Sequence, residues 1–245
     1  CFAFFHPQLP SEPLIFVEVA LLPEIPTVIT PLVDKKAETV DQPSQYKVAV
    51  FYSISNCEPG LRGVSMGNFL IKRVAEQLHA EFPGIKTFVT LSPIPGLMDW
   101  VAAGANLGEG VPAERLKPNL KVARDAALAV LKLESQSWSE RLAGGWHPDL
   151  ASEKEKVALL SLASMYLGLA STGRDGNPVA KFHLGNGAKL HQINWAADLS
   201  RKGLRQSACL MVNYLYDLGN VEENHERFAN GEIVYSKAVG RLMAP

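Results

Sequence analysis

The pattern of apolar and polar positions divides the first ninety residues into strands and one long helix. Strands are predicted where β-branched and aromatic residues form short runs bounded by proline or turn residues. A helix is predicted where Met66, Leu70, Val74 and Leu78 recur at helical spacing before Pro83. The expected elements are strands over residues 14–21, 46–55 and 86–91 and a helix over residues 64–82.

The remaining chain predicts helices first and mixed structure afterwards. Pro, Gly and Asn punctuate helical segments around residues 113–133 and 151–170, which indicates a helical insertion over about 97–172. Asn177-Pro178 is typical of an N-cap followed by proline at the first helical position, and it predicts a short helix through His183, with a strand as the alternative. Strands over 188–195 and 209–216 and a helix over 231–242 complete the prediction.

Composition narrows the class of protein. The chain has 245 residues, 47% hydrophobic content and 24 Lys plus Arg against 25 Asp plus Glu, a net charge of −1. This balance excludes a disordered chain and argues against a nucleic-acid binder. The 3 cysteines are far apart and match no zinc spacing, which indicates a reducing compartment and no metal site. No apolar run reaches the roughly 18 residues of a membrane span.

A glycine-bearing segment, residues 60–67, lies between a predicted strand and the predicted helix. A helix N-terminus preceded by glycines exposes backbone N–H groups and the positive end of the helix dipole, which suits a phosphate or pyrophosphate. Arg62 would add a cation. The segment is neither a Walker A loop nor a G-x-G-x-x-G turn, and a plain strand-to-helix turn is an equally good interpretation.

Two single residues are candidates for proton chemistry. Ser92 stands at a strand end stiffened by two prolines, although Thr90 and Ile94 occupy the glycine positions of a G-x-S-x-G elbow. His183 stands among apolar neighbours before a glycine-rich turn, and histidine is the side chain best matched to moving a proton near neutral pH. Local sequence alone favours the simpler interpretations, a Ser-Pro turn and a core or capping histidine.

These segments together resemble the malonyl-CoA decarboxylase family, along the whole chain and in the family's order. The matching stretches are Cys1-Phe-Ala-Phe-Phe-His-Pro7, Phe51-Tyr-Ser-Ile-Ser55, Gly60-Leu-Arg-Gly-Val64, Phe69-Leu-Ile-Lys-Arg-Val74, Leu91-Ser-Pro-Ile-Pro-Gly96, Phe182-His-Leu184, Asn186-Gly-Ala188, Ile193-Asn-Trp195, Asn213-Tyr214 and Tyr216. The resemblance implies an α/β fold of the N-acetyltransferase (GNAT) superfold, a mixed twisted sheet flanked by helices. Residues 1–245 would form a single catalytic domain.

The resemblance also implies the site residues. Ser92 corresponds to the family's catalytic serine, His183 to its catalytic histidine and Tyr216 to a supporting tyrosine. The CoA phosphate loop corresponds to Arg62, Gly63, Val64, Ser65, Met66, Gly67 and Asn68. This loop departs from the superfold's usual Q/R-x-x-G-x-G/A pattern, because Ser65 stands where the first glycine would be.

Further expectations follow from the resemblance. The substrate and product would be malonyl-CoA and acetyl-CoA, with no cofactor. The family's N-terminal helical domain, used in oligomerisation, would lie upstream of Cys1 and be absent from this chain, so the full protein is expected to be a homo-oligomer. Because Leu242-Met-Ala-Pro245 lacks a Ser-Lys-Leu peroxisomal signal, a cytoplasmic bacterial enzyme is expected.

The expected reaction is loss of CO2 from malonyl-CoA to leave the enolate of the acetyl thioester, with the thioester carbonyl as electron sink. Ser92 and His183 would meet as a hydrogen-bonded pair that positions the malonyl carboxylate, and His183 would be the source of the proton for C2. Tyr216 would orient the pair or contact the thioester. The alternatives are an acyl-CoA transferase, in which Ser92 attacks the thioester with His183 as base, and a CoA-binding module without chemistry.

Overall fold

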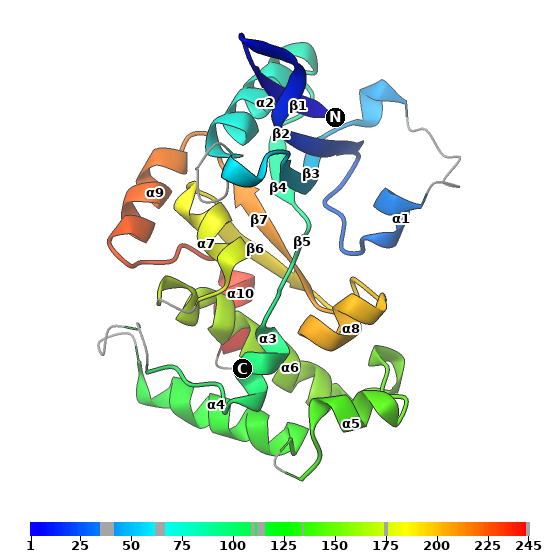
Figure 1. Cartoon of the computed structure of the whole chain (residues 1–245). Helices are drawn as coiled ribbons and strands as arrows, with labels where there is room; N and C mark the ends of the chain where they lie inside the picture. The colour runs from blue at the N-terminus through cyan, green and yellow to red at the C-terminus, as the bar shows by residue number, and fades with distance from the viewer. Residues whose placement is uncertain are drawn as a thin grey trace. The chain divides into compact units, whose positions relative to one another are not determined.

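A computed structural model describes residues 1–34, 42–61, 67–108, 111, 116–133, 135–173 and 176–243 (Figure 1). The chain divides into two compact units. The first comprises Cys1–Pro26 and Pro31–Leu91, and the second comprises Thr27–Thr30 and Ser92–Pro245. That the whole chain acts as one catalytic domain remains a prediction.

The first unit contains four paired strands and one long helix. Its elements are β1 (Phe2–His6), β2 (Leu9–Leu22), β3 (Val48–Asn56), α2 (Gly67–Glu81) and β4 (Thr87–Thr90), with the short α1 (Thr30–Val33) at the boundary and 3₁₀ turns at Pro43–Gln45 and Pro59–Leu61. β1, β2 and β3 pair antiparallel, and β3 pairs parallel with β4. The sheet of this unit is therefore mixed.

Helix α2 packs on this sheet through one apolar face. Its buried positions are Leu70, Ile71, Val74, Ala75 and Leu78, which recur at the spacing of successive helical turns. The helix contacts β1, β2 and β3. The helix and the three strands predicted in this part of the chain are confirmed.

Strand β2 is longer than its sequence predicts. The prediction began after Pro13, because proline cannot donate to a sheet, yet β2 begins at Leu9. The strand pairing explains this difference. Residues of β2 before Ile15 pair with β1 only, because the pairing of β2 with β3 starts at Ile15. Prolines are tolerated where one side of a strand has no ladder to complete. β1 itself was not predicted.

The second unit has a short antiparallel sheet surrounded by helices (Figure 1). Strand β7 (Met211–Tyr216) pairs with β5 (Ser92–Pro93) and with β6 (Lys189–Asn194). The helices are α3 (Leu97–Ala102), α4 (Pro118–Leu131), α5 (Trp138–Ala143), α6 (Glu153–Gly168), α7 (Pro178–Gly185), α8 (Arg201–Ser207), α9 (Val221–Ala229) and α10 (Lys237–Met243), with 3₁₀ turns at Pro148–Leu150 and Ala170–Thr172. The predicted class, a mixed α/β protein, is confirmed.

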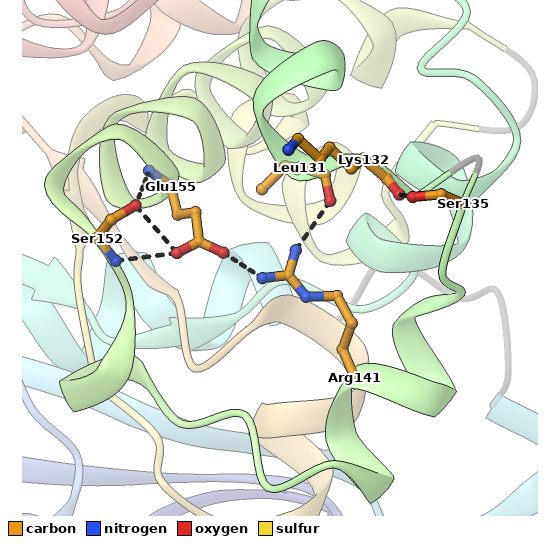
Figure 2. A network of polar contacts seen from close by, with 6 residues as sticks. All are labelled: Leu131, Lys132, Ser135, Arg141, Ser152 and Glu155. Carbon is orange, nitrogen blue, oxygen red and sulfur yellow. Dashed lines mark hydrogen bonds and ion pairs between the residues drawn. The ribbon is translucent and has the colours of Figure 1, made fainter.

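The predicted helical insertion corresponds to α3 through α6. Helix α6 is almost entirely buried from Ala158 to Gly168 and packs against α4, α10 and β6. Figure 2 shows how its first turn is tied to its neighbours: Arg141 of α5 pairs with Glu155, and its other nitrogen donates to the carbonyl of Leu131 at 2.9 Å. Glu155 in turn accepts from the Ser152 backbone N–H at 2.9 Å in a capping box.

The predictions for the last seventy residues hold with two differences. The short helix after Asn177 and the strands over 188–195 and 209–216 are present as α7, β6 and β7. The final helix is shorter than predicted, because Tyr235 forms a parallel bridge with Leu190 and the hydroxyl of Ser236 caps the helix by accepting from the N–H of Val239 at 3.1 Å. Helices α8 and α9 were not predicted.

Candidate active site

Ser92 is held at the start of the second unit by a short, stiff segment. It pairs with Val212 of β7, and its side chain is buried. Pro93 and Pro95 fix their own φ angles, and Ile94 between them is fully buried. The segment ends at Gly96, which has φ +78° and precedes α3; a Cβ there would also lie 3.0 Å from the hydroxyl of Tyr166. The backbone that carries the serine hydroxyl is therefore held in place.

His183 is placed by helix α7. Asn177 caps this helix by accepting a hydrogen bond from the N–H of Ala180 at 2.8 Å, and Pro178 occupies the first helical position. The helix ends before Gly187, which has φ +79° and lies so close to the carbonyl of Val221 that no Cβ would fit. Both ends of α7 are thus fixed, and His183 in its last turn is 5% exposed.

The two predicted residues meet. Ser92 Oγ lies 3.3 Å from His183 Nε2, and His183 Nδ1 lies 2.8 Å from the hydroxyl of Tyr216. Tyr216 is on β7, and Tyr214 two residues earlier shares its face of the strand. The ring of Tyr214 stacks on the imidazole with centroids 4.8 Å apart. Serine, histidine and tyrosine thus form one buried chain of hydrogen bonds.

The electrostatics of this chain favour neutral groups. Burial lowers the pKa of His183 to about 3, and the residue stays neutral over the physiological range. Burial also raises the pKa of Tyr216 above its usual value, so the phenol keeps its proton. With both groups neutral, each ring nitrogen of His183 has one partner and one of the two nitrogens carries the proton.

The structure tests the other predicted site residues only in part. Arg62, Gly63, Val64, Ser65 and Met66 lie outside the described residues, while Gly67 and Asn68 begin helix α2. Tyr214 was missed as a residue of the site, although the alternation of β7 places it on the same face as Tyr216. Among the residues that the structure describes, no three His, Cys, Asp or Glu side chains gather as a metal-binding group.

Fold and site together define a mixed α/β protein with a buried, uncharged Ser-His-Tyr arrangement suited to proton transfer. A sequence profile of the malonyl-CoA decarboxylase C-terminal domain matches residues 1–245. The chain belongs to this family.

Individual relatives agree with this assignment. The chain is 37% identical to mitochondrial malonyl-CoA decarboxylase of Anser anser anser, over 91% of this chain and 45% of the relative, and 39% identical to that of Rattus norvegicus, over 91% and 46%. A solved malonyl-CoA decarboxylase from Rhodopseudomonas palustris superposes with a TM-score of 0.75 at 43% identity, covering 98% of this chain and 52% of that one. One from Agrobacterium vitis gives 0.75 at 41%, covering 99% and 56%. The chain spans about half the length of these relatives.

Proposed function

We propose that this chain is the catalytic part of a malonyl-CoA decarboxylase, a carboxy-lyase that converts malonyl-CoA to acetyl-CoA and CO2. The observation that carries the proposal is the hydrogen-bonded chain of Ser92, His183 and Tyr216 in a member of this family. The substrate and the reaction are those named for the relatives. The geometry supplies a way for this chain to perform the reaction.

The reaction breaks the bond between the carboxylate carbon and C2 of the malonyl group. The bonding electron pair moves to C2 and is shared with the thioester oxygen as an enolate, and the carboxylate leaves as CO2. C2 then takes one proton, and a proton from solvent restores the donor. Because the enolate carbon is strongly basic, a neutral hydroxyl or imidazole N–H is a sufficient donor, and the lowered pKa of His183 is compatible with this step.

In this mechanism Tyr216 determines which ring nitrogen of His183 carries the proton. Its phenol stays protonated and donates to His183 Nδ1, which leaves the imidazole proton on Nε2, directed at Ser92 Oγ. Ser92 then directs its own hydrogen to the substrate, first at the malonyl carboxylate and then at C2. His183 replenishes the serine, and solvent replenishes His183. This order keeps His183 as the source of the proton, with Ser92 as the group nearest to carbon.

For the CoA portion of the substrate we propose residues 62–68. Helix α2 begins at Gly67 and continues for 15 residues, so the segment ahead of it leads into unpaired backbone N–H groups. Arg62 would contact a phosphate. We expect Arg62→Ala mainly to raise KM, because a phosphate contact is made equally in the ground and transition states, and an unchanged KM would argue against the contact.

The experiment that tests the function is release of labelled CO2 from malonyl-CoA labelled at the free carboxyl. It is run with this chain and with a version extended upstream, each beside its His183→Asn variant. Release that the variant loses supports both the reaction and the site. Binding of CoA without CO2 from either version overturns the proposal, and an acyl group trapped on Ser92 or transferred to an amine identifies the transferase alternative.

The expectations about location and assembly are proposals of the same kind. We propose a cytoplasmic enzyme that forms a homo-oligomer through a helical N-terminal domain and binds no nucleic acid. The vertebrate relatives are named as mitochondrial, so cell fractionation is the test of location. No helix in the described part of the chain has the length and apolar character needed to cross a membrane. Sedimentation of this chain beside the extended version tests the assembly.

A further inference from the structure

Asn177 uses both halves of its side-chain amide and is fully buried. Its Oδ1 accepts from the N–H of Ala180 at 2.8 Å, and its Nδ2 donates to the carbonyl of Pro95 at 2.8 Å. The two partners are far apart in sequence: Pro95 follows the candidate serine by three residues, and Ala180 is in the helix that carries the candidate histidine. One amide therefore joins the two segments that meet at the site.

At the serine end, the bond to Pro95 fixes a segment that has little freedom of its own. Two prolines and the fully buried Ile94 separate Ser92 from the carbonyl that Asn177 binds. The hydroxyl of Tyr166 on α6 donates to the same carbonyl at 3.2 Å. Since the φ angles of the two prolines are fixed, the position of this carbonyl constrains the backbone that carries Ser92.

At the histidine end, the bond to Ala180 fixes the first turn of α7. His183 is three residues further along the same helix, so a displacement of the first turn moves the imidazole with it. The Ser92 Oγ to His183 Nε2 separation of 3.3 Å is near the upper end of hydrogen-bond distances, and a small shift would break it.

We propose that Asn177 is a positioning residue that sets the distance between Ser92 and His183 by linking the Pro95 carbonyl to the N-terminus of α7. The inference rests on the proposed function in one respect, because turnover is one of its readouts. An amide is required: serine caps a helix but is too short to reach Pro95, and a carboxylate caps a helix but has no hydrogen to donate.

The decisive variant is Asn177→Ser, which keeps a good N-cap and removes the amide that links α7 to the Pro95 carbonyl. We expect kcat to fall roughly 10- to 100-fold with KM within about twofold, because misplacement by a fraction of an ångström affects the reacting geometry more than ground-state binding. Ser137→Ala is the matched control. It removes the cap of α5, which should lower the melting temperature, and Ser137 takes no part in the contacts of Ser92, His183 and Tyr216 described above, so kcat should not change.

The variant Asn177→Asp gives a pH signature. At neutral pH its carboxylate faces the Pro95 carbonyl without a hydrogen to donate, and kcat should fall as in Asn177→Ser. As pH falls, the protonated carboxyl can donate to that carbonyl while still capping α7, so the ratio of variant to native kcat should rise. The corresponding ratio for Asn177→Ser should stay flat. A residue that affects only folding would not separate the two variants once activity is normalised to the folded fraction.

Crystal structures of the native protein and of Asn177→Ser test the effect of the link on the Ser92 to His183 distance without measuring turnover. The proposal expects the Ser92 to His183 separation to exceed about 3.5 Å in the variant. An unchanged separation, an unchanged kcat, or an equal loss of kcat in Ser137→Ala overturns it. If the native enzyme releases no CO2, the proposed function fails, and the crystallographic distance still decides the role of Asn177.

Discussion

The second unit contains two polar networks that differ in charge and in burial. In the helical insertion, the charged pair of Arg141 and Glu155 lies near the surface, with the two side chains 15% and 18% exposed (Figure 2). At the candidate site, His183 is 5% exposed and its partners are uncharged. The charged network joins helices that follow one another in the insertion and has some access to water. The neutral network joins segments that are 33 and 91 residues apart and is buried.

The response of each titratable group to burial shows what the difference means. Burial acts to raise the pKa of Glu155, but hydrogen bonds from Ser152 and Arg141 outweigh it, and the pKa is lowered. At His183 burial is unopposed and lowers the pKa to about 3. Titratable residues whose pKa is strongly shifted by burial are concentrated at functional sites. Arg141 and Glu155 thus join helices of the insertion, and the neutral His183 is compatible with the proton transfer proposed for it.

The largest expected effect is loss of turnover when the neutral network is cut. Ser92→Ala and His183→Asn should each lower kcat by roughly 10²- to 10⁴-fold, the range of a positioned proton donor. Binding of CoA, measured by calorimetry, should change little because neither residue is assigned to the CoA portion. Turnover close to that of the native enzyme in either variant would end the assignment of the site.

The second effect is a pH dependence of stability that comes from His183. Its pKa is depressed in the folded state, so the unfolded chain binds more protons between pH 6.5 and 3. Stability should fall with decreasing pH in this window, by up to about 1.4 kcal/mol per pH unit, and this residue should contribute nothing above pH 6.5. Urea unfolding of the native protein and His183→Asn from pH 7.5 to 4.5 measures it. Parallel curves would show that His183 titrates normally.

A smaller loss is expected for Tyr216→Phe. Removing one hydrogen bond to His183 should cost about 1–3 kcal/mol of transition-state stabilisation, or roughly a 5- to 150-fold fall in kcat. Tyr214→Phe is the comparison, because the stacked ring is retained. If the two variants lost equal activity, the hydroxyl of Tyr216 would have no special role.

The charged network should show the reverse behaviour. Arg141→Met is expected to lower the free energy of unfolding by about 1–3 kcal/mol, between the values for surface and buried pairs. Its kcat at a temperature where it is folded should be unchanged within about twofold. Arg73→Met removes an exposed pair with Glu76, whose side chains are 74% and 47% exposed, and should change stability by less than about 1 kcal/mol. A loss of kcat in Arg141→Met would show that the charged network also affects turnover and that the two networks do not differ in this respect.

The sequence predicts local structure at the site better than it predicts the contacts within it. Asn177-Pro178 predicts the start of α7, and the alternation along β7 places two tyrosines on one face of the strand. The meeting of Ser92 with His183 came from the family resemblance, since 91 residues separate them and spacing has no bearing on such a contact. The link from Asn177 to Pro95 spans 82 residues and is visible only in the structure.

Helices α8 and α9 escaped prediction for a different reason. In α9 the one buried residue is Asn224, and in α8 the buried residues are Gly203 and Ser207. Helix α8 has no apolar stripe, and the apolar face of α9 comprises little more than Val221 and Phe228, which is too short a pattern for a periodicity argument. Asn224 instead donates to the carbonyl of Gly187 at 3.1 Å, a contact that no hydrophobic pattern encodes.

The prolines of β2 have a consequence for the solubility of the chain. The segment of β2 before Ile15 is paired with β1 and lies outside the register with β3, beyond which only the carbonyl of Leu14 has a described contact on that side, from the N–H of Cys57 at 2.9 Å. An unpaired edge offers N–H and C=O groups to a strand of another molecule, and this is a common start of aggregation. Pro10 and Pro13 have no N–H to offer, and Glu12 adds a charge beside them. The residues that end the predicted strand too early are also the ones that make this part of β2 a poor template for a strand of another molecule.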